Sequence, residues 1–281
     1  MHTVRRRAVL VAPASDEHKA RKALASSADE VVLDLEDAVT PDNKATARAT
    51  AASLVAEFGG KRLVSVRING FNTEWVHDDL SACAQMGPAL ATVVLPKAET
   101  PAELAEADGL LGDSATRLQA LVETPTGVRD IAALCSTTAR LDAVIIGYAD
   151  LGASLGRDPK SPSGVWHPIQ ETVLIAARAA GISVIDGPHL TIVDDEHFRA
   201  AKVWACTLGF DGTWVLHPNQ IASATQIFTP DPTALGEARR ALAAMHEATQ
   251  RGAGAVQLDS RMLDAALVSS ARRLLAKAGE Q

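Results

Sequence analysis

The sequence is poor in aromatic residues and in cysteine. Aromatics make up 4% of the 281 residues, with a single tyrosine, so Ala, Val, Leu and Ile must supply most of the 47% hydrophobic content. The three cysteines, Cys83, Cys135 and Cys206, are odd in number and show no metal-type spacing, which argues against a disulfide framework. They suit a reducing compartment. We therefore expect a cytoplasmic protein with an aliphatic core.

Long hydrophobic runs and long basic runs are also missing. No apolar run reaches the roughly 20 residues that a membrane span needs, and Pro13 and Asp16 interrupt the apolar stretch after Arg7, unlike a secretory signal peptide. The net charge is −7, and no basic run exceeds Arg5 to Arg7. Neither a membrane nor nucleic acid is expected as a main partner.

Short β-rich runs alternate with longer helical patterns over most of the chain. The predicted strands are residues 8–12, 30–35, 62–68, 92–95, 118–122, 143–146, 183–185 and 214–216, and clear helical patterns cover 41–58, 101–111, 168–180 and 194–208. Eight such units predict an α/β fold, a (β/α)₈ TIM barrel. An open doubly wound sheet is the alternative, but no Gly-x-Gly-x-x-Gly motif follows the first strand.

The pattern changes near Thr229, where the predicted strands stop. Two helical patterns follow, at residues 232–251 and 262–278, separated by Gly252-Ala-Gly254. We therefore expect a barrel domain over residues 1–228 and a helical C-terminal extension over residues 229–281.

Polar residues follow seven consecutive predicted strands, where barrel enzymes place their active sites. The second strand ends in three carboxylates within four positions, which a buried strand does not carry without compensation. The residues are Asp34, Glu36 and Asp37, then Arg67 and Asn69, Lys97 and Glu99, Glu123, Asp150, Asp186 and His217.

Several of these residues have an equally good structural explanation. Asp37 can cap the next helix, and the imidazole of His217 can be satisfied by a turn. Lys97 and Glu99 can form a rim ion pair, which contributes little stability. Arg67 can simply balance the buried acids.

Glu123 and Asp150 are harder to explain in this way. Both follow runs that predict burial, and neither has a basic neighbour within three positions. Buried carboxylates need a cation. The candidate ligands are oxygens without a Cys or His cluster, so Mg²⁺ fits, with Mn²⁺ possible, held by Glu123 and Asp150.

The motifs, in this order, are similar to those of the citrate lyase β-subunit and malyl-CoA lyase family of barrel lyases. The resemblance runs from Arg7 to about Lys277. The motifs are Val-Leu-Asp-Leu-Glu-Asp-Ala-Val, Val-Arg-Ile-Asn, Leu-Pro-Lys-Ala-Glu, Val-Glu-Thr-Pro-Thr-Gly, Gly-Tyr-Ala-Asp-Leu, Ile-Asp-Gly-Pro, Leu-Gly-Phe-Asp-Gly and Leu-His-Pro-Asn-Gln-Ile.

The resemblance implies a Mg²⁺-dependent carbon–carbon lyase that cleaves or forms a 3-hydroxyacyl-CoA such as malyl-CoA or citramalyl-CoA. The products would be a 2-oxo acid, glyoxylate or pyruvate, and an acyl-CoA. Glu123 and Asp150 would hold the metal, with Glu123 also near the substrate. Arg67 would contact substrate oxygens, and Asp264 would reach a neighbouring subunit's site as the acid/base in a trimer or hexamer.

Further roles follow from the resemblance and from its departures. Glu36 and Asp37 would support Arg67 and the metal, while Lys22 and Arg7 would contact CoA. The first-strand segment carries Asp16 near the place of a CoA-gripping arginine, and the loop after Asp150 is shorter than in malyl-CoA lyases. Three alternatives stay open: an aldolase for free 2-oxo acids, an acyl-CoA thioesterase, and a non-catalytic protein that binds CoA thioesters.

Overall fold

The computed structural model describes residues 4–158, 160–252, 254–258 and 261–279. It divides into two compact units, residues 6–226 and residues 227–281 together with the N-terminal residues before Arg6. Each unit is considered separately. Within the described residues, no helix is long and apolar enough to span a membrane.

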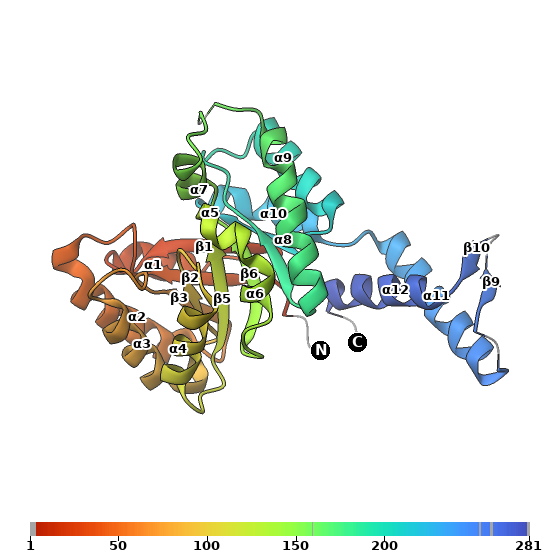
Figure 1. The fold of residues 1–281 in the computed structure, drawn as a ribbon, viewed down its shortest axis with the longest axis horizontal. Helices are drawn as coiled ribbons and strands as arrows, with labels where there is room; N and C mark the ends of the chain where they lie inside the picture. Colours follow the sequence, from red (N-terminus) through yellow and green to blue (C-terminus); the bar gives the residue numbers. More distant parts are fainter. Residues whose placement is uncertain (1–3, 159, 253, 259–260, 280–281) are drawn as a thin grey trace. The chain divides into compact units, whose positions relative to one another are not determined.

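The first unit is a closed barrel of eight parallel strands in sequential order, with helices around it (Figure 1). The TIM barrel expected from the sequence is therefore confirmed. Its strands are β1 (Ala8–Pro13), β2 (Glu30–Asp34), β3 (Leu63–Arg67), β4 (Thr92–Leu95), β5 (Arg117–Val122), β6 (Leu141–Ile146), β7 (Ser183–Asp186) and β8 (Gly212–Val215).

The helices of this unit follow the strands and begin with the expected signals. Thr100 caps α4 with a capping box, and Gly181 ends α8 in a left-handed conformation. The helices are α1 (Glu17–Leu24), α2 (Lys44–Phe58), α3 (Val76–Gln85), α4 (Pro101–Leu111), α5 (Pro125–Arg129), α6 (Ile131–Cys135), α7 (Tyr148–Ser154), α8 (His167–Ala180), α9 (Glu196–Leu208) and α10 (Ile221–Phe228). Short 3₁₀ turns are η1 (Pro41–Asn43), η2 (Gly87–Ala89), η3 (Ser163–Trp166) and η4 (Pro218–Gln220).

Alternate residues of the strands fill the barrel in layers, as the two-residue period requires. The middle layer is a cluster of buried, mostly aliphatic side chains that includes Val32 and Leu121 and also Trp214. Two residues further along the same strands come Asp34 and Glu123, at the C-terminal end of the barrel. The side-chain period thus carries both acids to the end where barrel enzymes act.

The opposite end of the barrel is closed by a polar layer. The guanidinium of Arg6 donates to the carboxylate of Glu30, to Thr92 Oγ1 at 3.2 Å and to Asp142 Oδ2 at 3.0 Å. Gln119 Nε2 donates to Glu30 Oε1 at 2.9 Å. Glu30 is fully buried, so this layer joins strands through the interior.

The second unit corrects one expectation. Its helices are α11 (Pro232–Gln250) and α12 (Ala265–Ala278), but an antiparallel pair, β9 (Val256–Leu258) and β10 (Arg261–Leu263), lies between them in sequence. The second helical pattern was predicted from residue 262, whereas the helix begins at Ala265. The strand residues are too few for the period of two to be distinguished from that of a helix.

We expect loss of Glu30 to destabilise the barrel strongly. In Glu30→Ala the buried Arg6 loses a principal partner, and breaking a buried pair costs about 3–5 kcal/mol. The matched control is Glu57→Ala, which removes an exposed partner of Arg21 at 2.8 Å and should cost less than about 1 kcal/mol. Urea unfolding measures both, and equal losses would contradict the structural role of the Arg6 layer.

Candidate active site

The ion pair of Arg67 and Asp34 is the centre of the acidic cluster. Arg67 and Asp34 are register partners on β3 and β2, and Arg67 donates from Nε to Asp34 Oδ1 and from Nη2 to Asp34 Oδ2, both at 2.7 Å. Burial opposes ionisation of both groups, but the mutual charge and hydrogen bonds outweigh it. The pKa of Asp34 is therefore lowered and that of Arg67 is raised.

Glu36 and Asp37 extend this pair toward the next strands. Arg67 Nη1 lies 3.0 Å from Glu36 Oε2 and 3.5 Å from Asp37 Oδ2. Burial, more than any neighbour, raises the pKa of Glu36. Lys97 Nζ donates to the other oxygen of Glu36, Oε1, at 2.6 Å. Glu36 therefore lies between two cations, Arg67 and Lys97.

Glu123 is a buried carboxyl group beside Lys97. The backbone N–H of Lys97 donates to Glu123 Oε1 at 2.9 Å, and a Cβ at Gly147 would lie 2.4 Å from Glu123 Oε2. Only glycine at 147 leaves room for this carboxylate. Burial and then the charge of Glu36 raise the pKa of Glu123 to about 8, so added positive charge would favour its ionised form.

Asp150 is placed differently from the sequence expectation. It lies in the first turn of α7, and its side chain is 41% exposed, so its predicted burial was wrong. The apolar run ends at Ile146, and the helix that follows turns Asp150 toward solvent. Lys97 Nζ approaches Asp150 Oδ2 at 3.3 Å and Glu123 Oε1 at 3.9 Å. The ion pair between Lys97 and Glu99 that the sequence offered therefore does not form, and Lys97 instead lies near Glu36, Glu123 and Asp150.

A third cation, Lys44, binds the backbone of the loop that carries Glu36. Lys44 Nζ donates to the carbonyl oxygens of Leu35 and Glu36, both at 2.7 Å, and to Asn69 Oδ1 at 2.6 Å. Asn69 in turn donates from Nδ2 to Asp79 Oδ2 at 2.6 Å. The loop that carries Glu36 is therefore fixed by a lysine.

The cluster has an excess of negative charge, which a divalent cation would balance. When all are ionised, the five acids Asp34, Glu36, Asp37, Glu123 and Asp150 exceed the three cations Arg67, Lys97 and Lys44 by two charges. Among the described residues, no group of three or more His, Cys, Asp or Glu has the arrangement of a metal site. Magnesium needs only one or two carboxylates, so Glu123 and Asp150 fit it.

Two other predicted site residues, Arg7 and Lys22, are not brought to this cluster by any described contact, and a third, Asp264, belongs to the second unit. Arg7 precedes β1 at the opposite end of the barrel, where it donates to Asp29 Oδ2 at 2.8 Å. Lys22 is exposed in the last turn of α1. Asp264 accepts from Leu267 N at 3.1 Å at the start of α12.

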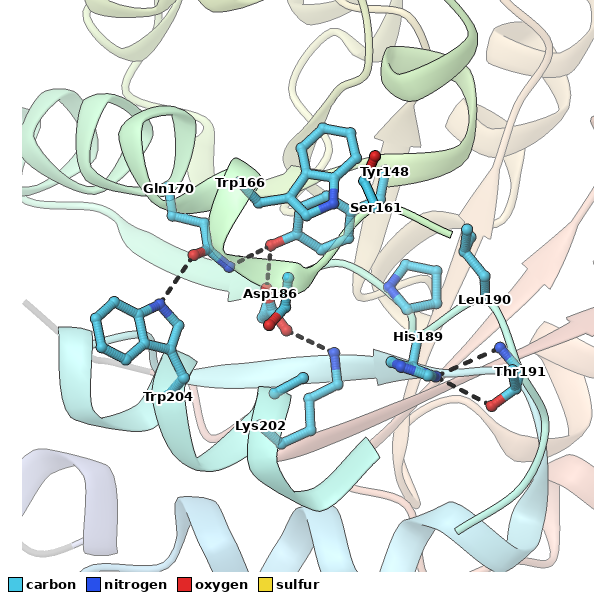
Figure 2. Close-up of a pocket in the computed structure, with 13 residues that line it drawn as sticks. Tyr148, Ser161, Trp166, Gln170, Asp186, His189, Leu190, Thr191, Lys202 and Trp204 are labelled. Carbon is cyan, nitrogen blue, oxygen red and sulfur yellow. Dashed lines mark hydrogen bonds and ion pairs between the residues drawn. The ribbon is translucent and has the colours of Figure 1, made fainter. Parts of the chain in front are cut away.

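A pocket of about 200 Å³ lies at the ends of β6 and β7 (Figure 2). Its floor is a buried network in which the hydroxyl of Tyr148 and Lys202 Nζ both donate to Asp186, the lysine at 2.5 Å. Gln170 Nε2 donates to the Tyr148 hydroxyl at 2.7 Å. Tyr148 opens α7, so this network anchors the helix that carries Asp150.

Lys44 and Lys202 were missed by reasoning from the sequence. Each lies at a position of its helix where a lysine is unfavourable unless it has a partner. Lys202 shares the buried face of α9 with Phe198 and Ala205, and a lysine on an apolar stripe needs a buried partner. Lys44 opens α2, where a cation opposes the helix dipole. Each position was a signal of an internal ion pair or carbonyl cluster.

A parallel barrel with charged side chains gathered at the C-terminal ends of its strands is typical of barrel enzymes, and comparison with known proteins gives the family. The family described as HpcH/HpaI aldolase/citrate lyase matches residues 7–218. The chain therefore belongs to the HpcH/HpaI aldolase/citrate lyase family, which places it among carbon–carbon lyases and confirms the resemblance read from the motifs.

The chain is also similar to individual members. It is 34% identical to an L-malyl-CoA/beta-methylmalyl-CoA lyase of Cereibacter sphaeroides, over 97% of this chain and 94% of the relative. It is 33% identical to a (3S)-malyl-CoA thioesterase of the same species, over the same shares. The crystal structure of CitE from Mycobacterium tuberculosis with magnesium, acetoacetate and coenzyme A matches with a TM-score of 0.76 and 32% identity, over all of both chains.

We expect Glu123 to make the metal-free protein less stable as the pH rises from about 4.5 to about 8. Its pKa is about 8 in the folded chain against an ordinary 4.5, so within this window the folded state keeps a proton that the unfolded chain releases. The stabilisation is complete below 4.5 and is lost above 8. Glu123→Gln should flatten the profile.

Urea unfolding in the presence of a chelator, at pH values from about 5 to about 9, measures this difference. Glu57→Gln, at an exposed position, is the control and should run parallel to the unchanged protein. A Glu123→Gln profile that also runs parallel would show that the buried carboxyl does not hold a proton in this range.

Proposed function

We propose that the protein is a Mg²⁺-dependent lyase that cleaves or forms a 3-hydroxyacyl-CoA, such as malyl-CoA or citramalyl-CoA. The products of cleavage are glyoxylate or pyruvate and an acyl-CoA. The observation that carries the proposal is the acidic cluster around Lys97, in which Glu123 and Asp150 face a single cation at the active end of the barrel. Similarity to malyl-CoA lyases over nearly the whole chain supports the same substrate class.

Glu123 and Asp150 are the residues that would hold Mg²⁺, or Mn²⁺, which accepts the same oxygen ligands. When bound, the metal supplies Lewis-acid polarisation of the 2-oxo acid portion of the substrate. Magnesium is present with acetoacetate and coenzyme A in the similar CitE structure, which supports this choice.

Arg67 is proposed to stabilise the negative charge that develops on the thioester oxygen. Its Nε and Nη2 are used by Asp34, which fixes the guanidinium plane so that Nη1 stays near Glu36 and Asp37. Glu36 and Asp37 are therefore positioning groups for Arg67. A preorganised, largely buried cation is the kind of electrostatic stabilisation that lowers such a barrier most.

Proton transfer is assigned to Asp264, on the basis of the family resemblance. Its carboxylate removes the proton of the 3-hydroxyl group. The carbon–carbon bond then breaks, and its electron pair passes to the thioester to form an enolate opposite Arg67. Asp264 returns the proton to the enolate carbon, which gives the acyl-CoA and regenerates the carboxylate. Asp264 caps α12 in the second unit, and its approach from a neighbouring subunit would make the enzyme a homo-oligomer, which the family resemblance gives as a trimer or hexamer.

The two residues proposed to contact CoA differ in their surroundings. Lys22 is exposed on α1 and available to a phosphate, whereas Arg7 is engaged with Asp29. Asp16 caps α1 and pairs with Lys19, so it adds negative charge where a nucleotide would approach. The small-molecule partners are an acyl-CoA and a 2-oxo acid, and we expect the enzyme to act in the cytoplasm.

A thioesterase is the second candidate, and the lengths of the matches favour it. Since 97% of this chain is about 273 residues, the 299-position match to the lyase contains about 26 positions that this chain lacks. The match to the thioesterase spans 273 positions and contains almost none. The chain therefore agrees in length more closely with the thioesterase than with the lyase.

Product analysis separates these functions. We expect malyl-CoA with Mg²⁺ to give glyoxylate and acetyl-CoA, detected by mass spectrometry, with turnover lost on chelation of the metal and at least about 10²-fold slower in Glu123→Gln. Malate and free CoA as the only products would instead establish the thioesterase. Cleavage of free 2-oxo acids alone would indicate an aldolase, and CoA binding without any product would indicate a non-catalytic binder.

Co-expression of two inactive variants tests whether Asp264 acts across subunits. Glu123→Gln removes a metal ligand and Asp264→Asn removes the base, so each alone should be at least about 10²-fold slower. In mixed oligomers an intact Asp264 can enter the site of a neighbour with an intact Glu123. We expect activity to return in purified mixed oligomers carrying two different tags, and its failure to return would place Asp264 outside the neighbouring site.

A further inference from the structure

Lys97 has an unusual backbone conformation. Among the described residues it is the only non-glycine residue with positive φ, at 49°, a conformation that residues with a Cβ rarely adopt. The same conformation directs its backbone N–H to Glu123 Oε1 at 2.9 Å. Glycine would adopt it with less strain, so a lysine here indicates a use for the side chain.

The side chain of Lys97 connects three carboxylates from different parts of the barrel. Its ammonium lies 2.6 Å from Glu36 Oε1, 3.3 Å from Asp150 Oδ2 and 3.9 Å from Glu123 Oε1. These acids follow β2, β6 and β5 respectively. Without a cation among them, the three would repel one another in a partly buried site.

We infer that Lys97 is a built-in counter-ion that holds Glu123 and Asp150 together and competes with the divalent metal for them. This inference rests on the proposed function, because it takes these two acids as the metal ligands. The contact with Glu36 is the shortest of the three, and Glu36 does not belong to the proposed ligand pair. Lys97 can therefore release Asp150 and Glu123 to a metal while it keeps Glu36.

The solvent exposure of the groups agrees with this division. Glu123 and Glu36 are buried, whereas the side chain of Lys97 is 31% exposed and Asp150 is more open still. The two groups that must separate when a metal enters are thus the two that face solvent. Lys97 weakens metal binding by its charge and keeps the empty site from being disrupted by repulsion.

The test is calorimetric titration of Mg²⁺ into chelator-treated protein. Lys97→Met removes the competing charge, so we expect its Kd for Mg²⁺ to be at least about fivefold lower than that of the unchanged protein. Lys97→Gly removes the charge and the strained backbone together, and should tighten binding as well. A merely structural lysine would give the opposite result, weaker binding in both variants.

Two controls separate charge at this position from general effects. Lys97→Arg keeps a cation and should leave the Kd within about twofold. Lys61→Met removes one positive charge from an exposed position between α2 and β3 and should leave the Kd unchanged. Unfolding curves of each variant without metal verify that it folds.

The outcomes distinguish this inference from the function on which it rests. If the unchanged protein binds Mg²⁺ and both Lys97→Met and Lys97→Gly bind it equally or less tightly, the role of Lys97 is overturned while the metal site stands. If the unchanged protein binds no Mg²⁺ at millimolar concentration, the metal site and the role of Lys97 are both overturned.

Discussion

Arg67 and Asp34 face each other across neighbouring strands, and their two hydrogen bonds at 2.7 Å determine how the other charges are arranged. With its Nε and Nη2 occupied, Arg67 offers Nη1 to Glu36. Glu36 then receives Lys97 on its other oxygen, and Lys97 reaches the proposed metal ligands. Each contact limits the position of the next group, so a cluster with more acids than cations is held in one arrangement.

The two ends of the barrel use buried charge for different purposes. At one end Arg6 and Glu30 are enclosed and join strands through the interior, which serves stability. At the other end the acids exceed the cations, and Asp150 and Lys97 remain open to solvent. A closed network resists exchange of partners, whereas an open one permits substrate and metal to enter. The buried charges that stabilise the barrel and the charges proposed for catalysis therefore lie at opposite ends of the barrel.

Much of the fold and part of the site followed from local patterns. The eight strands and the burial of Glu123 were predicted because apolar runs and a two-residue period are local properties. The burial of Asp150 was predicted wrongly because the helix start at Tyr148 changes the period just before it. The strands β9 and β10 were missed because three residues carry no distinguishable period. The partners of Lys97 were unpredictable because they lie 26 to 61 residues away in sequence.

The sequence by itself determined the barrel, its family and the end at which its polar residues gather, since these depend on the order of residue types along the chain. Only the tertiary structure decided which charges meet. Closure of the sheet brings β2, β4, β5 and the start of α7 to one point, where Lys97 becomes the common partner of Glu36, Glu123 and Asp150. Whether two charged side chains form an ion pair depends on distances of a few ångströms, and the folded chain sets those distances.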